Sequence, residues 1–455
     1  MKSIVCGAGV VGTSISEKLS SEGLEVTVID QSSELITKIN EKLDVKAIVG
    51  NGSNPSVLEK AGASNCDILI AVTRIDEVNM IACQIAHTVF KIPTKIARIR
   101  QQDYLNDVWS DSYRQNVLPV SAIISPEVEV AKAISRRLHA PGSFDMLELS
   151  NDRIKLIGLK CEKNSTILNL SIKEIANNFS DQLSNILLII RKEEHFVPKS
   201  STKLLEGDLV YFVVEESHVI NAMKAFGHTE KESTNVIIVG GGNIGYNLAK
   251  NIENNHKSVS TKIIELDQKR SNWLASNLDS TTVINGDALD NQILEEVNTD
   301  STGSFISVTN DDEVNVLASL LAKKSGANET IALINNSSYI SMLNNIGIDI
   351  TIDPKAITIS TILQKVRRGN IRSLYSIGEG LGEVIEAVIL KSSSFDNKNI
   401  KEIEFPKNVK VGSILRENQI IIPNSRTEFK IDDDVVFYAE KSSISKLEEL
   451  LAVKK

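Results

Sequence analysis

Two short glycine-rich stretches have the residue types and spacing that could bind a phosphate-bearing ligand. Each follows an apolar run and reads G-x-G-x-x-G, as GAGVVG in the first half and GGGNIG in the second. In such a motif the first glycine permits a tight strand-to-helix turn, the second lets the backbone approach a pyrophosphate, and the third lets helix and strand pack closely. The free amides and partial positive charge of the helix N-terminus then face the phosphates. The six glycines are Gly7, Gly9, Gly12, Gly240, Gly242 and Gly245.

An acidic residue ends the next apolar run after each motif. Asp30 follows Gly12 by 18 residues, and Glu265 follows Gly245 by 20. This spacing suits a carboxylate that accepts the hydroxyls of an adenosine ribose. Because a carboxylate would repel a 2'-phosphate, NAD or NADH is favoured over the phosphorylated forms; the alternative is an exposed strand-end acid. The other residues of the two loops would meet phosphates through their backbone: Ala8, Val10, Val11, Gly241, Asn243 and Ile244.

Further candidates follow predicted strands at the edge where open α/β sheets bind ligands. Asn51 and Asp287 suit a place near the adenine and a loop-capping role equally well. Arg74 could face either phosphate or solvent. The DEVN after Thr73 is typical of the first turn of a helix, with a ligand or subunit contact as the alternative. The candidates at this edge are Asn51, Thr73, Arg74 and Arg98 in the first half and Asp287 and Thr309 in the second.

One of these positions distinguishes the two halves. Arg98 ends the run IARIR, where a guanidinium could contact a pyrophosphate with two hydrogen bonds. The second half reads IALIN and has Leu333 at this position. We therefore predict that the second site binds nucleotide more weakly, or binds another species.

The elements that must position these residues alternate between strands and helices. Such alternation predicts a parallel sheet covered on both faces. The strands expected in the first half are 3–7, 25–30, 45–50, 67–72, 95–99 and 117–124.

The whole pattern occurs twice. TRIDEVN returns as TNDDEVN, and the turn GDLVYFVV returns as DDDVVFYA. The predicted fold class is α/β, with two tandem Rossmann-like doubly wound sheets, each followed by a small α+β domain. Helices opened by Pro126 and Pro354 are expected to act as connectors or dimerisation arms. The expected large domains are 1–124 and 234–354, the connecting helices 125–143 and 355–371, and the small domains 144–228 and 372–453.

Composition narrows the function classes. The chain has 455 residues, 42% of them hydrophobic and 24% charged, with a formal net charge of -9. This charge argues against a nucleic-acid partner. No apolar run reaches bilayer length and no signal-peptide pattern is visible, so we expect a cytoplasmic protein, with docking onto a membrane protein left open. The four cysteines and six histidines lack metal-ligand spacing, so we expect no metal site.

These motifs together resemble a known family. GAGVVG, GNGSNPSVLEKAGA, IARIR, VGGGNIG and VTNDDEVN resemble RCK domains, the regulators of potassium conductance. The tandem is similar to the peripheral RCK subunits of Trk-type potassium uptake, over essentially the whole chain. The resemblance implies that NAD(H) binds in the large domains (the RCK N-lobes), with ATP or ADP as alternative ligands of the same sites. It also implies that Arg98 contacts the nucleotide.

The resemblance further implies a homo-oligomeric RCK ring that gates an integral-membrane potassium channel subunit of the TrkH or TrkG type. The protein would then be a regulator, not an enzyme, peripheral on the inner face of the membrane. An NAD-dependent oxidoreductase and an RCK regulator of a different ion transporter are the alternatives. Neither small domain supplies a repeated His, Lys or Tyr that could serve as the acid–base group of a dehydrogenase.

Overall fold

Most of the chain is described by the computed structural model. The strand residues expected at 117–119 and most of the expected linker between the halves lie outside it. The described residues are 1–21, 23–104, 120–138, 142–178, 184–192, 194–228, 235–343, 346–366, 371–377, 381–391 and 393–451.

Each half begins with a six-stranded parallel sheet. The first has the order β3-β2-β1-β4-β5-β6 and the second β14-β13-β12-β15-β16-β17, which is the Rossmann order in both cases. The central strands are buried on both faces, which explains apolar runs such as ILIA in the first sheet and VIIV in the second. The first-half strands are β1 (Lys2–Cys6), β2 (Glu25–Asp30), β3 (Lys46–Val49), β4 (Ile68–Ala71), β5 (Thr94–Arg98) and β6 (Ala122–Ile124). The second-half strands are β12 (Asn235–Val239), β13 (Ser260–Glu265), β14 (Thr282–Asn285), β15 (Ser304–Ser307), β16 (Glu329–Leu333) and β17 (Ile350–Ile352).

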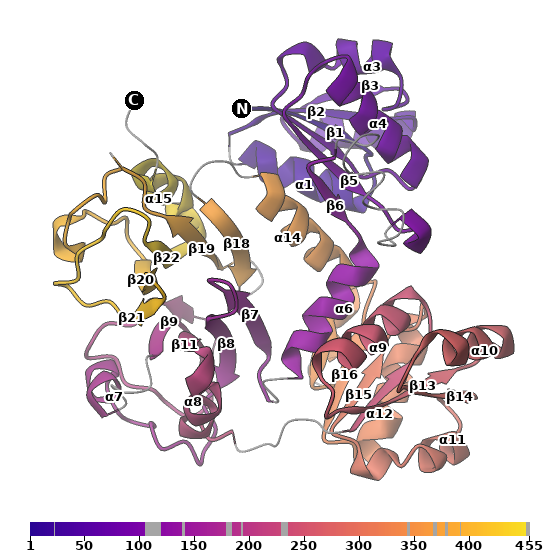
Figure 1. Cartoon of the computed structure of the whole chain (residues 1–455), viewed down its shortest axis with the longest axis vertical. Coiled ribbons are helices and arrows are strands. Elements are labelled where there is room, and N and C mark those ends of the chain that lie inside the picture. Colours follow the sequence, from indigo (N-terminus) through magenta and orange to yellow (C-terminus); the bar gives the residue numbers. More distant parts are fainter. Residues whose placement is uncertain are drawn as a thin grey trace.

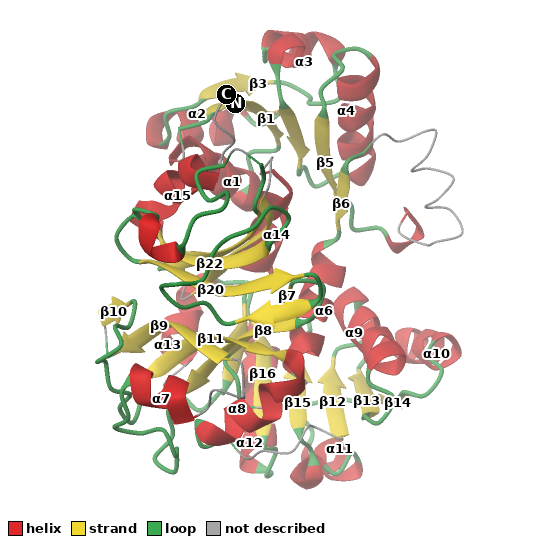
Figure 2. Cartoon of the chain, turned by 60° about the vertical axis from the view of Figure 1, so that its left-hand side comes forward, coloured by secondary structure: helices red, strands yellow, loops and turns green. Residues whose placement is uncertain are grey.

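Helices cover both faces of these sheets, so the predicted fold class is confirmed (Figures 1 and 2). The first sheet is accompanied by α1 (Val10–Ser21), α2 (Ser33–Lys42), α3 (Pro55–Lys60) and α4 (Asp76–Thr88). The second is accompanied by α9 (Asn243–Asn255), α10 (Gln268–Asn277), α11 (Asn291–Glu296), α12 (Asp312–Lys324) and α13 (Ile340–Leu343).

Each half ends in a five-stranded antiparallel sheet, with the orders β10-β9-β11-β8-β7 and β18-β19-β22-β20-β21. Both small domains contain the same ion pair to a buried carboxylate. Arg191 binds Asp208 and Arg416 binds Asp433 through two 2.7 Å hydrogen bonds each. The first has β7 (Asp145–Leu149), β8 (Ile154–Lys160), β9 (Ser184–Arg191), β10 (Glu194–Phe196), β11 (Leu209–Glu215), α7 (Ile172–Asn178) and α8 (Val219–Ala225). The second has β18 (Ile371–Ile377), β19 (Gly382–Val388), β20 (Val409–Arg416), β21 (Gln419–Ile421), β22 (Asp434–Glu440) and α15 (Ile444–Leu451).

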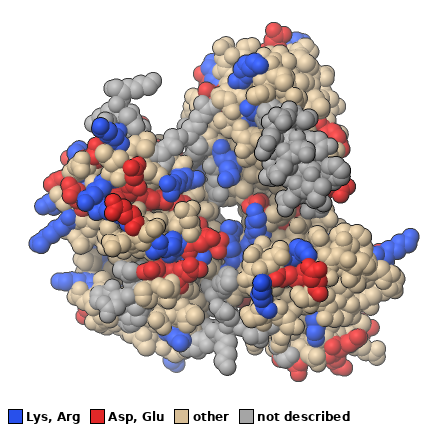
Figure 3. Space-filling view, viewed as in Figure 1, with Lys and Arg blue, Asp and Glu red and all other residues tan. Residues whose placement is uncertain are grey.

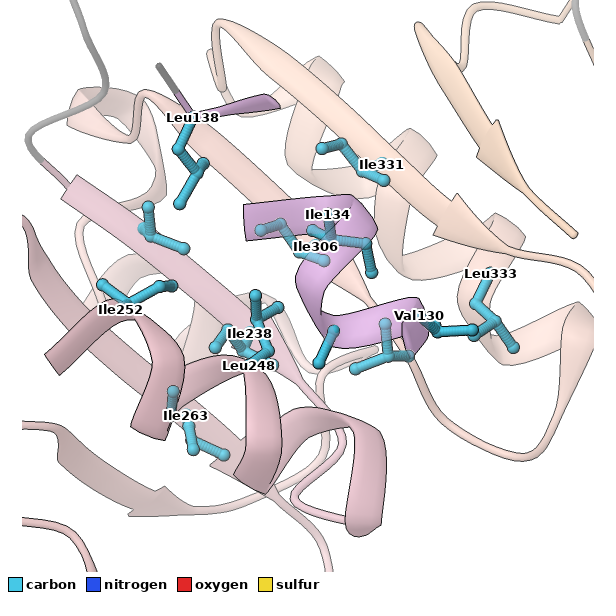
Figure 4. Close-up of a cluster of buried hydrophobic side chains, with 14 of the residues drawn as sticks. Val130, Ile134, Leu138, Ile238, Leu248, Ile252, Ile263, Ile306, Ile331 and Leu333 are labelled. Carbon is cyan, nitrogen blue, oxygen red and sulfur yellow. The ribbon is translucent and has the colours of Figure 1, made fainter. Parts of the chain in front are cut away.

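The two connecting helices cross between the halves. Helix α6 (Pro126–Arg137) leaves the first sheet and packs Val130 and Ile134 into the core of the second large domain, against Ile238 and Ile306 (Figure 4). Helix α14 (Pro354–Val366) makes the reciprocal crossing and places Ile362 in the core of the first large domain. The two helices also contact each other at the centre of the molecule (Figure 1).

The two small domains also form hydrogen bonds with each other. Asn185 donates from Nδ2 to the carbonyl oxygens of Val411 and Gly412 at 3.1 and 3.0 Å. Lys410, which occupies the position of Asn185 in the second half, donates to the carbonyl oxygen of Ile186 at 2.6 Å. Such reciprocal contacts are typical of a two-fold interface. The expected arms therefore pair the two halves of one chain.

Candidate functional site

The first and third glycines of each loop are required by the fold itself. Gly7 and Gly240 have φ angles of 113° and 96°, which side-chain-bearing residues rarely adopt. A Cβ on Gly12 would lie 1.8 Å from the carbonyl oxygen of Gly7, and one on Gly245 would lie 2.0 Å from that of Gly240. Because neither close approach can accommodate a methyl group, these glycines hold strand and helix together.

The second glycine of each loop has no such role in packing. A Cβ on Gly9 or on Gly242 would meet no atom within 4 Å. Both glycines immediately precede a helix, since α1 begins at Val10 and α9 at Asn243. The open space thus lies where helix amides are available to a phosphate, and the residues present fit a dinucleotide.

The two acidic residues hold the loops in place. Asp30 accepts hydrogen bonds from the amides of Ala8 at 2.7 Å and Ser32 at 2.8 Å. Glu265 accepts from those of Gly241 at 2.7 Å and Asp267 at 2.8 Å. Ionised carboxylates offer about four acceptor sites, so each acid retains capacity for ribose hydroxyls. The structure places each acid beside its glycine loop.

A buried asparagine, which the sequence analysis missed, organises the neighbouring edge. Asn79 is 0% exposed and accepts from the amide and hydroxyl of Thr73 at 2.9 and 2.7 Å. Its Nδ2 donates to the carbonyl oxygens of Thr73 and Arg98 at 3.2 and 2.9 Å. Asn315 repeats this pattern with Thr309 and Leu333. The repeated DEVN motif was the available signal, because its Asn recurs with the Thr in both halves.

Arg98 and Leu333, its counterpart in the second half, differ in charge and in environment. The Nε of Arg98 is buried and has no hydrogen-bond partner among the described residues. Burial lowers the pKa of this guanidinium, and the positive charge of Arg100 lowers it further. Leu333 is 2% exposed and belongs to the core that receives α6. The first site thus has a cation at this wall where the second has an apolar core residue.

An arginine that the sequence analysis did not select lies at the second loop. Arg270 donates from Nε to the carbonyl oxygen of Gly241 at 2.7 Å, and its guanidinium carbon lies 4.2 Å from the ring centre of Trp273. Burial lowers its pKa, while Glu265 opposes that shift. The equivalent residue of the first half is Leu35. The two positions correspond because the amide of Leu35 binds the helix-capping side chain of Ser32, and the amide of Arg270 binds that of Asp267.

The remaining candidates have simpler surroundings. Asn51 accepts from the amide of Ser53 at 2.9 Å, and Asp287 accepts from that of Leu289 at 2.9 Å. These contacts are typical of loop caps, the second of the two predicted explanations. Arg74 is exposed. All four cysteines are buried.

A polar link joins each candidate site to a crossing helix. Asp76 accepts from the amides of Arg100 and Gln101 at 2.8 Å, and the Nε of Arg100 donates to Glu127 of α6 at 3.0 Å. In the second half, Asp312 binds the amides of Asn335 and Asn336 at 2.8 Å. Lys355 of α14 donates to the carbonyl oxygen of Asn335. The loop after the fifth strand therefore contacts both the site helix and the helix that enters the other half.

Comparisons with known proteins agree with this architecture. The TrkA-N domain model matches residues 3–126 and 236–354, and the TrkA-C domain model matches residues 384–452. The Trk system potassium uptake protein TrkA of Azorhizobium caulinodans is 37% identical over 453 residues, or 100% of this chain and 99% of the relative. This chain belongs to the TrkA family. The TrkA protein of Halomonas elongata is 34% identical over 457 residues, or 100% of this chain and 99% of the relative. The RCK resemblance is thereby confirmed at the family level.

Solved structures show the same fold as this TrkA-family chain. The GsuK channel covers 99% of this chain and 78% of its own, with a TM-score of 0.62 and 16% identity. The GsuK channel bound to NAD has a TM-score of 0.60 at 16% identity, over 99% of this chain and 78% of its own.

The described residues show neither a membrane-spanning helix nor a cluster of metal-ligating side chains. Among the described residues, no helix combines the length and the apolar character needed to cross a membrane. Within the same part of the chain, no group of three or more His, Cys, Asp or Glu could hold a metal ion. On the face shown in Figure 3, lysines and arginines are interspersed with aspartates and glutamates.

Proposed function

We propose that this chain is a cytosolic NAD(H)-binding regulatory subunit that gates a Trk-type potassium channel or transporter through nucleotide-dependent conformational change. The observation that carries the proposal is the open space beside Gly9 and Gly242, each adjoining a helix N-terminus and a loop already bound by an acid. The similarity to Trk system potassium uptake proteins and a fold neighbour that binds NAD support the same proposal.

The proposed residue roles follow from the geometry. The loops 7–12 and 240–245 contribute backbone amides to the pyrophosphate, and Asp30 and Glu265 accept the adenosine ribose hydroxyls. Arg98, with its unpartnered buried Nε, donates to the phosphates in the first site. Thr73 and Thr309 fix the end of the fourth strand of each sheet through hydrogen bonds to Asn79 and Asn315 respectively.

Coupling to a partner requires that ligand bind two conformations with different affinity. The links from each site to a crossing helix, Arg100 to Glu127 and Asn335 to Lys355, provide a physical connection between a site and the other half. A ligand that moves the loop after β5 or β16 would therefore also shift the helix bound to that loop, and this helix packs in the core of the other half. Coupling energies of about 1–3 kcal/mol are typical of such systems.

The proposed partner is an integral-membrane potassium channel subunit, which would hold the protein at the inner face of the membrane. Assembly of several copies into a ring is part of the proposal. Ile81 on α4 and Leu317 on α12 occupy equivalent positions and are 48% and 50% exposed. Because α6 and α14 are buried within the chain, these exposed helices are better candidates for contacts between copies.

The test uses the full chain and two matched substitutions. Gly9→Ala and Gly242→Ala add a methyl group to open space, so the melting temperature should stay within about 1 °C of the wild-type value, as for neutral surface changes. If the space serves nucleotide, calorimetric NADH affinity should fall about tenfold or more at the altered site. Unchanged affinity in both variants would contradict the proposal. As a steric control, Gly12→Ala should destabilise the protein by about 3 kcal/mol, because its methyl group cannot be accommodated.

Two assays separate the regulator from the alternatives. Incubation with NADH and a panel of carbonyl compounds should give binding without oxidation of NADH, whereas turnover would favour the oxidoreductase. Isolation of the protein from native membranes should yield a potassium-conducting partner, whereas recovery with a different ion transporter would favour the other regulator. Potassium flux through the reconstituted pair should depend on NADH and lose that dependence in Gly9→Ala.

A further inference from the structure

Helix α1 joins the first glycine loop to the second small domain. The helix begins at Val10, beside the open space at Gly9. Near its C-terminal end, Lys18 forms a 3.0 Å ion pair with Glu383 of β19. With a rise of about 1.5 Å per residue, Lys18 lies about 12 Å along the helix axis from Val10. One helix therefore contacts a candidate nucleotide site at one end and a distant small domain at the other.

The carboxylate of this ion pair is buried. The side chain of Glu383 is 3% exposed, and that of Lys18 is 26% exposed. Strand β19 lies between β18 and β22, where Glu383 is in register with Ser376 and Ala439. A buried carboxylate has lost its hydration and depends on a nearby opposite charge for stability. The positions of the end of α1 and of β19 therefore depend on each other.

Apolar packing connects the same two parts of the molecule. Ile15 and Leu19 of α1 share a core with Ile362 and Val366 of α14. Helix α14 contacts both α1 and β18, the strand next to β19 (Figure 1). A displacement of α1 would therefore act on the second small domain through the ion pair and through α14.

The corresponding helix of the second half makes a different contact. The position of Lys18 is occupied in α9 by Asn251, because the glycine loops align Gly12 with Gly245. The Oδ1 of Asn251 accepts a hydrogen bond from the Oγ of Ser135 at 2.6 Å. Ser135 belongs to α6, so this end of α9 is joined by a neutral hydrogen bond to a crossing helix.

The first small domain also differs at the position that receives the helix. Lys155 of β8 occupies the position of Glu383, since β8 and β19 pair with β11 and β22 in the same register. Lys155 is buried and forms ion pairs with Glu148 and Glu216 at 3.3 and 3.6 Å. Both acids belong to the first small domain itself. The charge at this position therefore stabilises its own domain.

We propose that the Lys18–Glu383 ion pair transmits the occupancy of the first nucleotide site to the second small domain, and that the second site is not coupled to the first small domain in this way. This inference rests on the proposed function, because it assumes that nucleotide binds beside Gly9. A ligand that shifts α1 changes the environment of the buried pair. The response to ligand at the first site then extends to β19 and its neighbour β22.

Hydrogen exchange of the full chain, without NADH and at saturating NADH, tests the inference. In the wild type, NADH should change the exchange rates of amides in β19 and β22 by about threefold or more. Lys18→Asn introduces the residue of α9 and should abolish this response while NADH still binds. Lys18→Asn combined with Glu383→Gln should do the same without leaving a buried charge unpaired. The charge-swapped variant, Lys18→Glu with Glu383→Lys, should restore the response.

The matched control is Asn251→Ala, which changes the same position of α9 and should leave the response of β19 and β22 intact. The melting temperature of each variant shows whether it remains folded. The inference is overturned if the uncharged double variant keeps the NADH response, or if the charge-swapped variant does not regain it. A wild-type chain that binds NADH without any change in β19 and β22 would also overturn it, while the proposed function would stand. If NADH does not bind the wild-type chain, the proposed function itself fails.

Discussion

The two large domains form the same crevice and line it differently. In both, the glycine loop, the acid that binds it and the buried asparagine have matching contacts within a few tenths of an ångström. The positions that differ include Arg98 against Leu333 and Leu35 against Arg270, which lie on opposite sides of the crevice. Groups that shape the backbone were retained after duplication, whereas groups that would face a ligand diverged. The comparison separates what the fold needs from what a ligand needs.

The largest effects are expected from substitutions in the crossing helices, because each half completes the core of the other. Ile134 and Ile362 occupy equivalent positions and are both 0% exposed. Truncation of a buried Ile to Ala costs about 2–5 kcal/mol. Ile134→Ala should therefore raise hydrogen exchange in β12 and β15 of the second half, although the residue belongs to the first. Ile362→Ala should raise exchange in β1 and β4.

A matched control is Ile157→Ala, which empties a core position that lies wholly within the first small domain. Its effect on exchange should stay in that domain. If Ile134→Ala and Ile362→Ala loosened only their own halves, the crossing arrangement would be wrong. The same result would remove the proposed route from each site to the opposite half.

The next effect in size concerns the asparagines. Asn79→Ala leaves the amide of Thr73 and the carbonyl oxygen of Arg98 without these partners, at about 1–3 kcal/mol for each group left unsatisfied. Asn315→Ala removes the same contacts and should cost the same free energy of unfolding. Only Asn79→Ala should also weaken NADH binding through a displaced arginine, because Leu333 has no charge to misplace.

Denaturant unfolding and NADH titration of both variants check this prediction. Asn79→Asp is a useful second variant, since it keeps acceptors for Thr73 but loses the donor to the carbonyl oxygen of Arg98. Equal losses of NADH affinity in the two alanine variants would show that Arg98 does not distinguish the sites.

Local sequence was sufficient for the fold class and the backbone of the site. Apolar runs of strand length, the glycine spacing and the strand-end acids each constrain a few adjacent residues, and the structure has them where the sequence predicts. Asp30 and Glu265 could be found because their strands place them beside the loop by simple geometry. Because the same motifs occur in both halves of the chain, each half supports the structural assignment made in the other.

What the sequence did not predict depends on contacts between distant segments. Pro126 indicates the start of a helix, but the sequence of α6 does not reveal that Ile134 packs against strands more than a hundred residues later in the chain. Arg270 was missed because the candidate residues were chosen mainly where the two halves agree. The first half has Leu35 at this position, so the repeat gave no signal for it. Asn79 was read as part of a helix start because its partners, Thr73 and the carbonyl oxygen of Arg98, meet only in the folded sheet.

The last prediction concerns the pH dependence of stability and separates the two small domains. Asp434 and Glu386 form a buried acidic pair in the second, where the first has Leu209 and Gly158. Glu386 accepts from the amide of Ser150 at 2.7 Å, and Arg372 donates to Asp434 at 2.7 Å. Burial and the neighbouring Glu386 raise the pKa of Asp434 from 3.8 to about 7, although Arg372 opposes the shift. The first small domain has no counterpart of this acidic pair at the equivalent positions.

The sign follows from proton binding. The folded state keeps a proton on Asp434 that the unfolded chain releases near pH 4, so stability is fully present below that pH and is lost as pH rises toward 7. One proton limits the slope to about 1.4 kcal/mol per pH unit. Asp434→Asn should flatten the dependence of the free energy of unfolding between pH 5 and pH 7 and leave the variant more stable than wild type at about pH 8. An unchanged slope in the variant would mean that Arg372 keeps Asp434 ionised and that the two small domains respond alike to pH.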